Sequence, residues 1–173
     1  PDVPCGNSLG VLTPRDPSVR PLRQLAAGTA MLASLPFDWA LRMRLAGTNL
    51  NRFVLTDCML PNVDDAVTTR LAQLALQMCA TTAWTDELWQ LAQSEGWSER
   101  REPAVEAEQR RALATEIDVA VGAAFGLTHE DIAWMTRGEP FIKGFWRIER
   151  SLPEAQRRPN RWLAASLATT TDT

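Results

Sequence analysis

Apolar residues recur at helical spacing through the middle of the chain, and this periodicity constrains the fold more than any other feature. The clearest stripe consists of Val67, Leu71, Leu74, Ala75, Met78 and Cys79. A second stripe, in a helix expected over residues 106–125, consists of Leu113, Ile117, Ala120, Val121 and Ala124. The sequence has no alternating strand series and no internal repeat. It therefore predicts a mainly α fold, with a short strand-containing segment near residues 52–57, where Phe53, Val54 and Leu55 form an apolar run.

Capping residues mark where several of these helices begin and end. Asp64 and Asp65 suit the start of the helix with the clearest stripe. Thr128 and Asp131 have the spacing of a capping box, and Gly126 is a helix stop. Further helices are expected over residues 18–34, 37–46, 84–96, 128–136 and 160–168, whereas residues 1–17, rich in Pro and Gly, are expected to be irregular.

The composition is that of a globular protein without a membrane segment. The chain of 173 residues is 45% hydrophobic and 23% charged, and no apolar run is long enough to cross a bilayer. Its three cysteines are far apart, so a zinc site is not expected, and Cys79 is expected to be a buried free thiol. We expect a reducing, cytoplasmic setting. Because the chain begins at Pro1, we also expect it to be a piece of a larger protein.

Charge is distributed unevenly along the chain. The net charge is −3 overall, and residues 61–137 hold thirteen acidic residues against six Arg. Both flanking parts carry a small positive excess. Any contact with DNA is therefore expected from the two ends, although ordinary solvated faces would give the same pattern.

Two segments of the chain are similar to a known family. Ser34–Pro61, SLPFDWALRMRLAGTNLNRFVLTDCMLP, resembles a stretch near the C-terminus of large adenine-specific DNA methyltransferases of restriction-modification and phage-defence systems. A second segment, LATEIDVAVGAAFGLTHEDI over residues 113–132, resembles a helical signature of the same type IIG-like enzymes. The resemblance implies three regions, namely the end of a TaqI-like target-recognition region (1–61), a helical spacer (62–137) and a basic aromatic tail (138–173).

The catalytic motifs of that family are not in this sequence. Such enzymes carry a glycine-rich S-adenosylmethionine loop and an Asn/Asp-Pro-Pro-Tyr/Phe tetrapeptide that holds the flipped adenine, whereas this chain has no Tyr and no Pro-Pro pair. The carboxylates of Glu116 and Asp118 are expected to face solvent, and His129 to be a surface residue at a helix start. We therefore expect no catalytic residue, metal or cofactor here, with S-adenosylmethionine bound by an upstream methyltransferase domain.

Basic residues near both ends are the candidates for contact with double-stranded DNA. Arg can grip phosphate or read guanine, and Asn can read adenine. Asn49 is instead expected to stabilise a turn, and Arg52 departs from the family pattern, which more often has an apolar residue there. The predicted DNA-binding residues are Arg42, Arg44, Asn51, Arg52, Lys143, Arg147, Arg150, Arg157, Arg158 and Arg161.

Tryptophans leave two interpretations open. Trp39, Trp84, Trp89 and Trp134 are expected in the core, whereas Trp146 and Trp162 lie among the basic residues of the tail. Aromatic residues between basic ones suit a nucleic acid, and they equally suit a helix that docks on another domain. The first hypothesis is thus a DNA-positioning segment of a methyltransferase. The alternative is a non-enzymatic helical module whose acidic middle binds a partner subunit.

Overall fold

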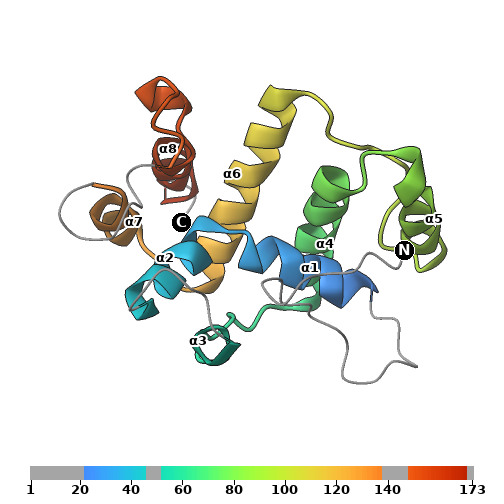
Figure 1. The fold of residues 1–173 in the computed structure, drawn as a ribbon, viewed down its shortest axis with the longest axis horizontal. Helices are drawn as coiled ribbons and strands as arrows, with labels where there is room; N and C mark the ends of the chain where they lie inside the picture. Colours follow the sequence, from blue (N-terminus) through green and yellow to red (C-terminus); the bar gives the residue numbers. More distant parts are fainter. Residues whose placement is uncertain (1–21, 46–51, 138–147, 171–173) are drawn as a thin grey trace.

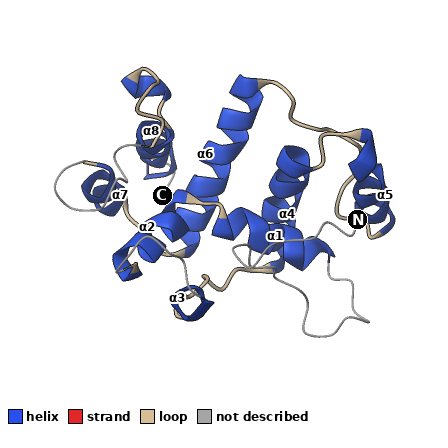
Figure 2. Cartoon of the chain, viewed as in Figure 1, coloured by secondary structure: helices blue, strands red, loops and turns tan. Residues whose placement is uncertain are grey.

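The computed structural model describes residues 22–45, 52–137 and 148–170, and within them every regular element is helical (Figure 2). The mainly α fold predicted from the sequence is therefore confirmed. The α-helices are α1 (Leu22–Leu32), α2 (Leu35–Arg44), α3 (Arg52–Thr56), α4 (Asp65–Cys79), α5 (Asp86–Ser94), α6 (Ala107–Ala124), α7 (His129–Thr136) and α8 (Arg158–Thr170). Two short 3₁₀ turns, η1 (Ala83–Thr85) and η3 (Glu154–Gln156), precede α5 and α8.

Helix α6 runs through the middle of the molecule, with α1, α4 and α5 on one side and α2, α7 and α8 on the other (Figure 1). Helices from all three predicted regions pack together, because α1 lies on α4, while α8 lies on both α6 and α7. In the described ranges no helix has the length and apolar character that a membrane span requires.

The first cluster of buried side chains, which we call the apolar core, lies between α1, α4, α5 and α6. Leu71 and Leu74 of α4 are fully buried there, and Ile117 and Val121 of α6 join them. Burying each such side chain stabilises the fold by roughly 1.5–3 kcal/mol. The indole N–H of Trp89 donates to the Ala80 carbonyl at the end of α4, at 2.8 Å, and so ties α5 to that helix.

The second cluster, which we call the junction, lies where α2, α7 and α8 meet α6. Its buried apolar members are Leu35, Ile132, Met135 and Trp162. Trp162 packs directly on α6 at Gly122, where a Cβ atom on that residue would lie 3.2 Å from Cζ2 of the indole. The absence of a Cβ atom at this glycine therefore lets the indole approach the backbone of α6.

Several predicted helix boundaries are also confirmed. The Asp64 side chain caps α4 by accepting from the Val67 N–H, and Thr128 and Asp131 form a reciprocal capping box at α7. Gly126, just past α6, has a φ of 72°, the left-handed conformation that favours glycine at a helix stop. These local signals fix where the long helices lie.

The strand predicted at Phe53–Leu55 is wrong, because these residues belong to helix α3. An apolar run this short has no periodicity that separates strand from helix. A strand also needs a neighbour to pair its backbone groups, and the described ranges contain none.

Three expected core residues are exposed, namely Cys79, Trp84 and Trp134. Cys79, the last residue of α4, is exposed. Trp84 is 95% exposed, since it lies in η1 before the periodic part of α5 begins. Trp89 is buried, as expected.

Candidate functional site

Arg158, predicted to bind DNA, instead forms an ion pair with a buried carboxylate. Its Nε and Nη2 donate to the two oxygens of Asp118 at 2.7 and 2.8 Å, and Nη2 also donates to the Ala33 carbonyl. The Asp118 side chain is completely buried. Such a two-pronged pair fixes both direction and distance, so it joins the start of α8 rigidly to α6.

Asp118 also binds the start of α2. The Leu35 N–H donates to Asp118 Oδ1 at 2.7 Å, and the neighbouring Ser34 accepts from the Phe37 N–H to cap the helix. Burial raises the pKa of Asp118 to about 6, an effect that Arg158 and the Leu35 N–H oppose by stabilising the charged form. The group is therefore mostly ionised at neutral pH and has two strong partners.

The expectation that Asp118 faces solvent is wrong. Helix α6 lies between the apolar core and the junction, so it buries more than one face. The sequence prediction used a single apolar stripe, which corresponds to one buried face only. Glu116 does face solvent, as expected, and pairs with Arg70 at 2.6 Å. An acidic residue inside the apolar run Ile117–Val121 was the signal in the sequence that pointed to a buried polar contact.

The other described arginines of the tail also bind within the protein. Arg161 donates to Glu108 at 2.8 Å and to the Thr115 hydroxyl at 3.3 Å. Arg157 donates to the carbonyls of Leu152 and Arg150. The side chain of Arg150 is exposed.

Near the other end, Arg42 pairs with Asp38 one turn earlier in α2, at 2.8 Å. Arg44 is exposed and donates to the Ala40 carbonyl at 3.2 Å. The remaining predicted DNA-binding groups, namely Asn51, Lys143, Arg147 and the side chain of Arg52, lie outside the part that the structure describes. The described candidates therefore form two groups, one on α2 and one around η3 and α8, and within the second group the partly buried Arg158 is held by Asp118.

Besides Trp84, two tryptophans have an exposure different from the one expected. Trp162 is fully buried, so its indole is not available to stack on a base. Trp134 is 41% exposed and packs edge-on against Trp39, with ring centroids 5.9 Å apart. The Arg137 guanidinium lies over the Trp134 ring, 5.2 Å from its centroid, in a cation–π contact. Trp146 is outside the described residues.

His129 lies at the first position of α7, as expected, and contacts a serine of α8. Its Nδ1 lies 2.8 Å from Ser166 Oγ, and that hydroxyl donates to the Leu163 carbonyl. Which of these two atoms donates depends on the tautomer of His129. The pair therefore links α7 to α8.

In the described ranges, no group of three or more His, Cys, Asp or Glu side chains is arranged to hold a metal ion. Comparison of the chain with family models, with curated proteins and with solved structures gave no match.

Proposed function

We propose that this chain is a DNA-positioning segment from the C-terminal part of an adenine-specific DNA methyltransferase of a restriction-modification or phage-defence system. One observation carries the proposal. The two segments that resemble this family contact each other directly, because Leu35 of the first donates to Asp118 of the second across 83 residues. The contact gives a physical reason for these two segments to be found in the same protein.

In this proposal the segment contributes positioning and connection, and an upstream domain with its S-adenosylmethionine performs methyl transfer. The junction gives α2 and α8 a fixed geometry on α6, and both carry basic residues that reach solvent. A pair one helical turn apart, such as the partly buried Arg42–Asp38 pair, contributes little stability, so exchanging the carboxylate for a phosphate costs little free energy. The described residues that would contact DNA phosphates are therefore Arg42, Arg44, Arg150 and Arg161. Arg158 would instead hold α8 in place on α6.

The test is fluorescence anisotropy of labelled duplex DNA across a salt series. Binding to phosphate releases counterions, so the slope of log K against log salt should fall by up to about 0.9 for each phosphate that is no longer neutralised. We expect Arg44→Ala with Arg150→Ala to reduce the slope. Arg101→Ala, which removes a cation from the acidic middle and breaks only a surface pair with Asp86, should leave it unchanged. Equal slopes for all variants would contradict the proposal.

The second candidate, a partner-docking helical module without DNA affinity, is favoured by Trp84. A tryptophan with 95% of its surface exposed is uncommon in an isolated fold, and Leu88 of α5 is also exposed. Tryptophan is the side chain that most often dominates protein–protein interfaces. A folded chain that shows no DNA binding at low salt would favour this candidate.

A further inference from the structure

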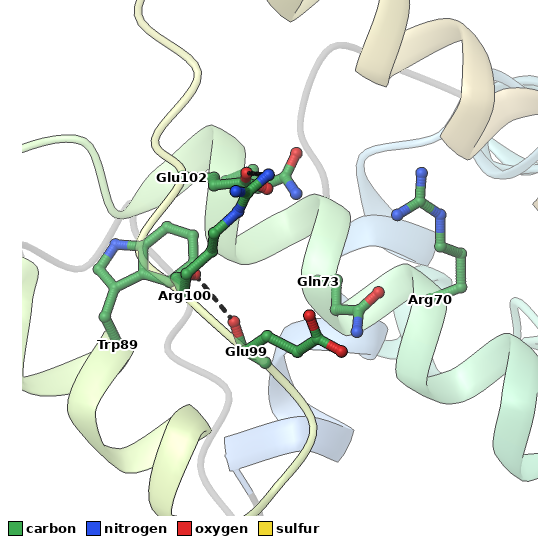
Figure 3. Close-up of a pocket in the computed structure, with 8 residues that line it drawn as sticks. Arg70, Gln73, Trp89, Glu99, Arg100 and Glu102 are labelled. Atoms are coloured by element: carbon green, nitrogen blue, oxygen red, sulfur yellow. Dashed lines mark hydrogen bonds and ion pairs between the residues drawn. The ribbon is translucent and has the colours of Figure 1, made fainter.

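A cavity of about 450 Å³ lies on the opposite side of α6 from the junction, between one face of α4 and residues 98–102. Arg70, Gln73 and Gln77 of α4 line one wall, and Trp89 of α5 contributes apolar surface. Figure 3 shows Glu99 extending toward Gln73, and Arg100 reaching toward Glu102. Cavities of this size hold small ligands or single side chains.

The positive charges of this cavity are already neutralised. Arg70 pairs with Glu116, and Arg100 pairs with Glu102. The Gln73 side-chain amide donates to the Trp97 carbonyl at 2.7 Å. The two arginines that line the cavity are thus paired within the protein, whereas the Gln77 amide has no partner among the described residues.

Acceptors, in contrast, are left over. Within the described ranges, no hydrogen bond or ion pair engages the Glu99 carboxylate or the Gln77 side chain, and the Gln73 side-chain oxygen accepts none. An ionised carboxylate only accepts, and each amide oxygen has two lone pairs. The cavity therefore has one free negative charge and at least two neutral acceptors. The surrounding residues 61–137 add a net negative charge that attracts cations.

We propose that this cavity binds the guanidinium group of an arginine from a partner polypeptide. A guanidinium has five donors in a planar fork, which suits acceptors on separate walls better than the compact ammonium of lysine. Glu99 would take one edge of the fork, and the oxygens of Gln73 and Gln77 the other donors. This inference is independent of the DNA-binding proposal.

The experiment is a titration of the whole chain, labelled with ¹⁵N, with N-acetyl-arginine amide. A single side chain should bind with a dissociation constant on the order of millimolar. We expect saturable shifts of the Trp89 indole N–H and of the amides of residues 98–102. The neutral isostere N-acetyl-citrulline amide should produce no saturable shift at the same concentrations, and the lysine analogue should bind more weakly than arginine.

Glu99→Gln keeps the shape and removes the charge, and it should weaken arginine binding by about two- to fivefold, the range typical of losing an ion pair at an accessible site. Glu87→Gln is the matched control, because Glu87 is exposed on α5 and does not line the cavity, so its affinity should equal that of the wild type. Equal binding of citrulline and arginine, no effect of Glu99→Gln, or saturable shifts with inorganic phosphate in place of arginine would each overturn the proposal.

Discussion

The apolar core and the junction share helix α6, but they are stabilised by different kinds of contact. In the core, buried aliphatic side chains of α1, α4 and α6 pack on one another. In the junction, by contrast, lie the buried polar residues of the described chain, namely Ser34, Asp118 and Ser166. The indole nitrogens of Trp39 and Trp162 are also buried and have no hydrogen-bond partner.

This difference shows what each region contributes. Apolar contacts are non-directional, so the core provides stability and tolerates adjustment. A buried charged pair costs desolvation energy, and its net contribution to stability is small or negative compared with an apolar replacement. It does specify one arrangement of the helices that it joins. The junction thus fixes the geometry of the two basic surfaces, and the core holds the molecule together.

The sharpest test of the comparison is Arg158→Met. This change leaves the Asp118 charge buried without its partner, and it should lower the free energy of unfolding by about 3–5 kcal/mol. The matched control is Arg70→Met, which removes the partner of Glu116 two residues away on the same helix. That pair is solvent-exposed, so the loss should be about 0–1 kcal/mol. Urea denaturation measures both, and similar losses would contradict the distinction between them.

Truncating a buried side chain of the apolar core should lower the free energy of unfolding nearly as much as Arg158→Met. Leu74→Ala removes a fully buried side chain and should destabilise the fold by about 2–5 kcal/mol. Leu88→Ala, at a partly exposed position on α5, should cost less than half as much. An unchanged unfolding midpoint for Leu74→Ala would mean that this side chain does not pack in the core.

The pH dependence of stability should come from the junction. The pKa of Asp118 in the folded protein, about 6, lies above its ordinary value of 3.8, so the folded state holds this proton more tightly than the unfolded chain does. Stability from this group is fully present below about pH 4 and is lost as pH rises through 6, by at most about 3 kcal/mol.

Asp118→Asn removes this titration and provides the reference. The free energy of unfolding of the wild type minus that of the variant should fall between pH 4 and pH 6.5. Glu108 and Asp131, whose pKa values are lowered by their hydrogen bonds to Arg161 and Thr128, act in the opposite direction but are common to both proteins. A difference that is flat or rises with pH would exclude Asp118 as the source.

The smallest effects are expected from replacing one glycine in each region with alanine. Gly122→Ala pushes a methyl group against the fully buried Trp162 ring, and such overpacking costs about 1–3 kcal/mol, partly offset by about 1 kcal/mol of better helix propensity. Gly28→Ala on α1 meets nothing within 4 Å and should stabilise by about 0.5–1 kcal/mol. Thermal unfolding should therefore shift in opposite directions.

Sequence reasoning recovered the core far better than the junction. The stripe through Leu71 and Leu74 depends only on residues close together in the chain, as do the caps at Asp64 and Thr128. The contacts of Asp118 join residues 40 and 83 positions apart, and no periodic pattern encodes such partners. The exposure of Trp84 was missed for a related reason, since a 3₁₀ turn interrupts the helical period there.

The candidate site was predicted in part. Charge and residue type led to the arginines of α2 and α8, but they do not reveal which of them bind within the protein. The acceptors around the cavity were not found at all, because Gln73, Gln77 and Glu99 come from two segments whose proximity depends on the packing of α5 against α4. The partners of the arginines and the composition of the cavity both depend on contacts between residues far apart in the sequence.

The placement of Arg158 also has a consequence for the order in which the protein assembles. Helices α1, α4 and α6 can pack as soon as they have left the ribosome, since their contacts span shorter stretches of chain. Asp118 must wait for residue 158, and the Arg158–Ala33 contact closes a loop of 125 residues, which makes it slow to form. The polypeptide would therefore collapse first around its aliphatic half, and the mutual orientation of α2 and α8 would be set only after α8 has been synthesised.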